Sequence, residues 1–239
     1  MPKRHSARTP GSSRRSISKP RKTEKARATW TQKELKQLDA LDTPAKIQAF
    51  LDALPYDPED GGRSVRSTLR LRTAHCLGGS LLAAYCLERA GFGPACVVGL
   101  EAENDDSHCI AVYKRRGFWG AVAKSNTTLL RSRDPVYPSL RALVLSYHDF
   151  YINSLGEKTL RAYTGPLRLS AFDRKTGRTQ DWLFAEQHIS AFEDDEHWPE
   201  PVDLLEGISM DDLIPAPPGT GIHEACFLGS DPDGLFQPE

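Results

Sequence analysis

The sequence predicts an α+β domain in which an antiparallel sheet packs on a central helix that begins near Cys76. Residues 76–87 are apolar or small on almost every side, a pattern typical of a helix buried on most of its surface. Three segments of strand length then follow, separated by short polar turns, which favours antiparallel pairing between neighbours.

Charge is distributed unevenly along the 239 residues. Residues 1–30 carry ten Lys and Arg and one acid, giving +9, whereas the remainder carries 21 basic and 31 acidic residues, giving −10. Residues 1–29 hold too few large apolar side chains to offset the entropy of ordering, so we expect a disordered basic tail. A folded domain over 30–198 and an irregular Pro-, Gly- and Asp-rich segment over 199–239 complete the expected organisation.

Composition excludes several classes of protein. The N-terminus lacks the apolar run of a secretory signal, and no stretch approaches the roughly 20 apolar residues that span a bilayer. The five cysteines form no C-x-x-C pair, which argues against a disulfide framework or a zinc ribbon. We therefore expect a cytoplasmic protein with reduced thiols, no membrane association and no cofactor.

Two helices are predicted before the central one. Residues 31–41 have helical spacing, with Thr31 as N-cap and Glu34 at the capping-box position. Residues 44–54 follow, with Thr43 as cap, Pro44 at the first helical position and an apolar stripe that ends at Leu54. Residues 55–66 have the composition of a loop.

The central helix and the sheet come next. The helix is expected within 74–91, with Gly91 as its C-terminal stop. Strands are expected at 95–101, 107–114 and 118–125, the last two joined by a hairpin turn over 115–117. A helix over 138–151, a strand near 164–170 and a short helix near 183–190 complete the prediction.

Cys76 is the candidate nucleophile. A catalytic cysteine acts as a thiolate, and a helix N-terminus favours that negative charge through its free N–H groups. Gly78 and Gly79 follow and allow close approach of backbone or substrate. The other cysteines are expected in the middle of the same helix, within strands, or in the C-terminal segment, and fit the role less well. The alternative is a cysteine that only packs in the core.

His108 is the candidate base, since it begins a strand directly after a polar turn. Hairpin geometry pairs position 108 with 124 or 125, which brings the end of the returning strand beside the imidazole. Asn126 is the first choice for the group that orients His108, and Ser125 the second. Asp134 is a more distant carboxylate alternative.

This order of residues resembles the transglutaminase-like superfamily, a circularly related cousin of the papain fold. The resemblance rests on a buried helix headed by Cys, then a strand with His, then a strand ending in Asn or Asp, over roughly residues 67–130. The segments TLRLRTAHCLGGSLLAA, GFWGAVAKSN and RDPVYPSLR also resemble an uncharacterised bacterial transglutaminase-like family. Two departures are Leu77, where an aromatic is common, and Asn126 in place of the usual Asp.

The resemblance implies thiol-dependent acyl transfer at the amide of a peptide or protein. Cys76 would attack the carbonyl, His108 would carry the proton, and water or an amine would release the acyl group. Peptide or isopeptide hydrolysis is the first choice and amine cross-linking the second. The alternative is a catalytically silent module that keeps the fold to recognise a peptide or protein partner.

Two further hypotheses rest on local composition. His75, Cys76, His108 and Cys109 are possible zinc ligands, but neighbours in a strand point to opposite faces, so we expect no metal site. The basic tail could contact nucleic acid, although it carries no aromatic residues for base stacking, and a solvated tail is the simpler expectation.

Overall fold

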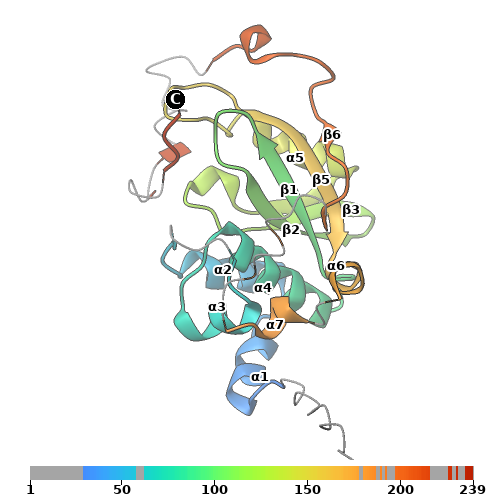
Figure 1. Ribbon diagram of the computed structural model, residues 1–239. Coiled ribbons are helices and arrows are strands. Elements are labelled where there is room, and N and C mark those ends of the chain that lie inside the picture. Colours follow the sequence, from blue (N-terminus) through green and yellow to red (C-terminus); the bar gives the residue numbers. More distant parts are fainter. Residues whose placement is uncertain are drawn as a thin grey trace, which may run out of the picture.

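The computed structural model describes residues 29–57, 62–177, 180–186, 189, 192, 197–215, 226–227, 230 and 235–238. Within these residues the fold is α+β, with one antiparallel sheet covered by helices on both faces (Figure 1). The predicted tail over 1–29 lies outside the described residues except for Thr29. The boundaries expected at 30–198 and 199–239 stay predictions.

The described strands form one six-stranded sheet in the order β4-β3-β2-β1-β5-β6. Three of them were predicted to within a few residues: β1 (Cys96–Ala102), β2 (His108–Arg115) and β3 (Phe118–Val122). The strand expected near 164–170 is β5 (Leu160–Arg168), and α6 (Leu169–Thr176) starts directly after it. The remaining two, β4 (Arg133–Tyr137) and β6 (Val202–Asp203), were not predicted, because β4 is an edge strand with a central proline and β6 is only two residues long.

The hairpin between β2 and β3 has the expected tight turn. Arg116 and Gly117 both have positive φ angles, 53° and 88°, as a two-residue hairpin turn requires. Arg115 pairs with Phe118 and Ala111 with Val122. The same register continued beyond Val122 brings Ser125 opposite His108, so the residues that follow β3 return to the beginning of β2.

The central helix, α4 (Cys76–Arg89), begins at Cys76, as predicted, and packs on β1 and β2. Its residues are buried almost throughout, and Ser80 Oγ donates a 2.7 Å hydrogen bond to the Cys109 carbonyl in β2. The opposite face of the sheet is covered by α5 (Leu140–His148), which was predicted over 138–151. Two apolar layers therefore enclose the sheet, and α4 is locked to β2 near the end that carries His108.

Two helices precede α4 as predicted, and a third was missed. Both α1 (Gln32–Asp39) and α2 (Pro44–Asp52) begin at the expected caps, and α1 has the complete capping box. The missed helix is α3 (Val65–Leu71), capped by Ser64. Its buried face includes Arg66, which is only 7% exposed, and this charged residue hides the apolar pattern that predicts a helix.

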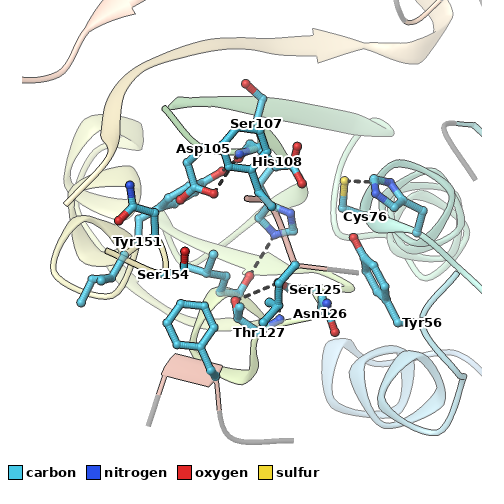
Figure 2. Close-up of a pocket in the computed structure, with 18 residues that line it drawn as sticks. Tyr56, Cys76, Asp105, Ser107, His108, Ser125, Asn126, Thr127, Tyr151 and Ser154 are labelled. Carbon is cyan, nitrogen blue, oxygen red and sulfur yellow. Dashed lines mark hydrogen bonds between the residues drawn. The ribbon is translucent and has the colours of Figure 1, made fainter. Parts of the chain in front are cut away.

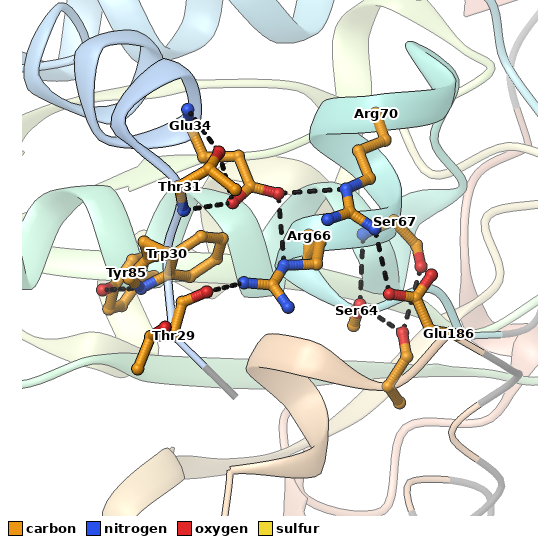
Figure 3. A network of polar contacts seen from close by, with 11 residues as sticks. Thr29, Trp30, Thr31, Glu34, Ser64, Arg66, Ser67, Arg70, Tyr85 and Glu186 are labelled. Carbon is orange, nitrogen blue, oxygen red and sulfur yellow. Dashed lines mark hydrogen bonds and ion pairs between the residues drawn. The ribbon is translucent and has the colours of Figure 1, made fainter. Parts of the chain in front are cut away.

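A buried ion network explains the burial of Arg66 (Figure 3). Its guanidinium lies 3.2 Å from the Glu34 carboxylate and 4.6 Å from the centroid of the Phe184 ring in α7 (Asp181–Phe184). Arg70 makes a second ion pair with Glu34, at 3.0 Å. The network joins α1, α3 and α7, and it is supported by hydroxyls of α3 and its cap that donate to the Ala185 carbonyl. The short helix predicted at 183–190 thus starts at Asp181, and residues 187, 188 and 190 lie outside the described residues.

Two buried polar side chains hold the segment after β3. The Gln48 amide on α2 bonds both backbone groups of Ala123, at 3.0 Å and 3.1 Å, in the manner of a neighbouring strand. The Lys124 ammonium donates to the Leu51 and Leu54 carbonyls at the C-terminal end of α2. Burial lowers the pKa of Lys124 to about 8. These contacts fix the chain immediately before Ser125 and Asn126.

The expected irregular C-terminal segment is partly packed. Beyond residue 198, β6 pairs with β5, Leu204 is buried, and a short 3-10 helix, η4 (Met210–Asp212), follows. In the parts of the chain that the structure describes, no helix combines the length and the apolarity needed to cross a membrane.

Replacing Gln48 with alanine tests the link between α2 and the segment after β3. Gln48→Ala leaves a buried N–H and a buried carbonyl of Ala123 without partners, and each such loss costs about 1–3 kcal/mol. We expect the free energy of unfolding of this variant, measured by urea denaturation with circular dichroism, to be lower than that of the wild type by an amount in this range. The matched control is Lys46→Ala on the same helix, which removes an exposed ion pair to Asp42 and should cost under about 0.5 kcal/mol. Equal stability of the two variants would contradict the assigned role.

Candidate active site around Cys76

Cys76 stands at the N-terminal end of α4 with only 6% of its surface exposed. The preceding residue, His75, is the N-cap, but its side chain makes no capping hydrogen bond. Instead its Nδ1 atom lies 3.2 Å from the Cys76 sulfur. The first N–H groups of α4 and the His75 imidazole therefore both act on the same sulfur.

His108 begins β2 and approaches the Cys76 sulfur from the sheet (Figure 2), and it forms a side-chain hydrogen bond with that sulfur. The His108 Nε2 atom is 3.0 Å from the Leu130 carbonyl, which belongs to the short 3-10 helix η1 (Thr128–Leu130). A carbonyl can only accept, so Nε2 carries the proton of this hydrogen bond. Nδ1 is then the ring nitrogen that can exchange a proton with the Cys76 sulfur. The backbone of η1 thus fixes the tautomer that a general base needs.

The structure brings all four predicted site residues into one cavity: Cys76, His108, Ser125 and Asn126 line it together. Ser125 Oγ accepts from the Thr127 backbone N–H at 3.1 Å and lies 3.2 Å from the Thr127 hydroxyl. This turn shapes the wall that faces His108, and Asn126 is buried beside it. The role of Asn126 as the group that orients His108 stays a prediction, next to the observed bond to Leu130. Asp134 lies on β4 and lines a different cavity with Pro44.

The charge state of Cys76 follows from its neighbours. Burial by itself raises the pKa of the thiol, but the charge of His75, hydrogen bonds from His108 and His75, and the charge of His108 outweigh it. Together they lower the pKa of Cys76 to about 5. Near neutral pH the sulfur is therefore a thiolate, the reactive form of a nucleophilic cysteine.

The other cysteines have the opposite character. All five are free and buried. Burial raises the pKa of Cys86 to about 12, places that of Cys109 well above the ordinary value, and raises those of Cys96 and Cys226. Only Cys76 of the five has a lowered pKa, which separates a candidate nucleophile from cysteines that pack in the core.

Tyr56 is a site residue that sequence reasoning missed. The backbone around it is held against the chain before α4, because the Ala74 N–H donates to the Pro55 carbonyl and the Asp57 N–H donates to the Ala74 carbonyl, both at 3.3 Å. The hydroxyl end of Tyr56 points toward Cys76 in Figure 2. Burial, followed by the charge of the Cys76 thiolate, raises the pKa of Tyr56, so its hydroxyl stays a hydrogen-bond donor. The sequence places Tyr56 in a loop with no motif to single it out.

His75 was weighed in the sequence only as a metal ligand. Among the described residues no group of three or more His, Cys, Asp or Glu side chains is arranged to hold a metal ion. Cys109 belongs to the apolar layer under α4, whereas its neighbour His108 bonds to Leu130 in the layer under α5. The signal that could have identified His75 was its N-cap position directly before the nucleophile.

Two cavities meet at Cys76 and share Ser107 and His108. The smaller, of about 70 Å³, is the one shown in Figure 2, and Phe227, Leu235 and Phe236 of the C-terminal segment contribute to its walls. The larger, of about 570 Å³, is lined by Leu77 and Trp198 in addition to Cys76. A substrate that crossed from one cavity to the other would present its middle to the sulfur.

No protein-family model matches the chain. No curated protein matches it either.

The pKa of Cys76 can be read directly from the ultraviolet absorbance of its thiolate, taken as the difference between the wild type and Cys76→Ala. We expect a midpoint near pH 5. Because both histidines lower the pKa of Cys76, His75→Ala and His108→Ala should each raise the midpoint, by at least about one unit, which corresponds to 1.36 kcal/mol. The control is His148→Ala, a histidine of α5 that does not line either cavity. A wild-type midpoint near the free-thiol value of about 8.5 would contradict the ion pair.

Proposed function

We propose that the protein catalyses thiol-dependent acyl transfer at an amide of a peptide or protein, with a transglutaminase-like, papain-related domain as its scaffold. The observation that carries this proposal is the buried Cys76 sulfur at a helix N-terminus, paired with two histidines that lower its pKa to about 5. A buried thiolate that lies beside two cavities has the properties of a nucleophile. The order of Cys-bearing helix and His-bearing strand supports the family.

The reaction proceeds in two steps, formation of an acyl-enzyme and its release. In the first, the Cys76 thiolate attacks the amide carbonyl, the carbon–nitrogen bond breaks, and the departing amine takes a proton from His108. The product is a thioester between Cys76 and the acyl group. In the second step, water or an amine gives its proton to His108 and attacks the thioester, and the carbon–sulfur bond breaks. His75 supplies a second positive charge to the thiolate and keeps it ionised in the resting protein.

Two donors are available for the oxygen that becomes negative during the attack. One is the backbone N–H of Cys76, which is free of helical bonding at the first position of α4. The other is the Tyr56 hydroxyl, directed toward Cys76 and kept protonated by its raised pKa. Donors of this kind act only when charge develops, so they accelerate the chemical step rather than binding.

Hydrolysis of a peptide or isopeptide bond is the first choice for the overall reaction, and transfer to an amine the second. The rival is a binding module in which the same cavities recognise a peptide without reaction. The two differ in one observable, because only the enzyme forms a thioester to Cys76.

Intact-mass measurement of the full-length protein with a panel of peptide amides and activated peptide esters tests the reaction. We expect an adduct with the mass of the acyl group on Cys76, released by hydroxylamine as thioesters are. It should be absent from Cys76→Ala and retained in Cys86→Ala, the matched control on the same helix. Peptide binding without an adduct from any activated ester would favour the silent module and overturn the proposal.

Removing the Tyr56 hydroxyl tests the second oxyanion donor. Tyr56→Phe should lower kcat by about 10²-fold, in line with the loss of one such donor, and leave KM within about twofold. Steady-state kinetics on the best substrate of the panel provide the measurement, with Tyr137→Phe on β4 as the control tyrosine. A change in KM with kcat preserved would instead make Tyr56 a binding residue.

A further inference from the structure

The larger cavity beside Cys76 has a polar floor that the proposed reaction does not use. The floor is formed where β1 and β5 pair, at Gly99 opposite Thr164. Glu101 lies two residues further along β1 and therefore on the same face as Gly99, the face that packs toward α4. The cavity thus combines a carboxylate, a hydroxyl and a glycine within reach of the reactive sulfur.

Glu101 adds a carboxylate to this cavity without a Lys or Arg beside it among the described residues. No Lys or Arg is among the described residues that line it, and no described cation forms an ion pair with Glu101. Its hydrogen bond within the described structure comes from the Ser107 hydroxyl, at 3.0 Å, which leaves most of its acceptor capacity open. An acceptor-only group in a cavity wall favours a cationic donor.

Thr164 provides a second open acceptor next to the first. Thr164 is only 5% exposed, and its hydroxyl has no hydrogen-bond partner in the described structure. A buried hydroxyl without a partner is costly, so a ligand that bonds to it is stabilised. A Cβ atom on Gly99 would lie 2.5 Å from Thr164 Oγ1 and 3.0 Å from Glu101 Oε1. Both oxygens therefore lie close to the Gly99 backbone, where a larger residue would push them apart.

Apolar side chains form the walls between this floor and Cys76. Leu77 follows the nucleophile on α4, and the rings of Phe192 and Trp198 lie with their centroids 6.2 Å apart. The Trp198 ring reaches the floor, where its edge would be 3.6 Å from a Cβ on Gly99. An aliphatic stem fits such walls, and a tryptophan beside the floor also favours a cation.

We propose that this cavity is a subsite for a basic side chain, lysine or arginine, of the peptide substrate. The cationic head binds Glu101 and Thr164, and the aliphatic stem lies along Leu77 and Trp198. Its function as a specificity pocket rests on the proposed acyl transfer, since a side chain held there places a neighbouring amide of the same peptide at Cys76. The binding itself does not depend on the chemistry.

Binding to the full-length Cys76→Ala protein separates recognition from reaction. Isothermal titration compares two blocked hexapeptides that differ only in one central residue, lysine or its uncharged isostere norleucine. We expect the lysine peptide to bind at least about tenfold more tightly, equivalent to 1.4 kcal/mol. Glu101→Gln, introduced into the Cys76→Ala protein, should abolish the preference for lysine and leave the binding of the norleucine peptide unchanged. The control is Glu103→Gln, which removes an exposed carboxylate paired with Arg161 and should preserve the preference for lysine.

The outcomes distinguish the subsite from the reaction. Equal affinities of the two peptides, failure of both to bind, or a lysine preference that survives Glu101→Gln would overturn the subsite. A charge reversal, Glu101→Lys, gives an independent check, because it should transfer the preference to a peptide with glutamate at the same position. A lysine preference that depends on Glu101, in a protein that forms no thioester, would confirm the subsite and contradict only the proposed reaction.

Discussion

A negative charge on a buried sulfur is unstable unless positive charge and donors surround it, and this constraint organises the site. Cys76 meets it with the N-terminus of α4 and with two imidazoles, one from the residue before it and one from β2. The two histidines differ in how they are held. His75 is positioned by the chain direction at the helix start, whereas His108 is fixed by its hydrogen bond to Leu130.

The ion pair in turn depends on the docking of α4 against the sheet. The bond from Ser80 to the Cys109 carbonyl locks the helix to the strand that carries His108. Gly79 contributes as well, since a Cβ there would lie 2.5 Å from the Lys124 side chain. Lys124 lies between β3 and Ser125 in the chain, and its ammonium bonds carbonyls at the C-terminal end of α2. The close contact between Gly79 and Lys124 therefore aligns α4 with the sheet and with the wall of the smaller cavity.

Elements with a clear periodic pattern or cap could be predicted from the sequence. The apolar run headed by Cys76 predicted the start of α4. Hairpin geometry predicted that the residues directly after β3 return to His108. The misses have physical reasons: α3 buries an arginine through a network with Glu34, and β4 is an edge strand interrupted by Pro135. At the site, the acceptor for His108 is a backbone carbonyl, a group that every residue carries and that no sequence pattern reveals.

The most direct test of the account compares alkylation of the five cysteines by iodoacetamide at pH 6, read residue by residue with mass spectrometry. The lowered pKa of Cys76 and the raised pKa values of the others predict that Cys76 is labelled first and that Cys86 and Cys109 stay unmodified in the folded protein. Labelling of Cys76 no faster than that of Cys96 would contradict the thiolate–imidazolium pair and, with it, the proposed nucleophile.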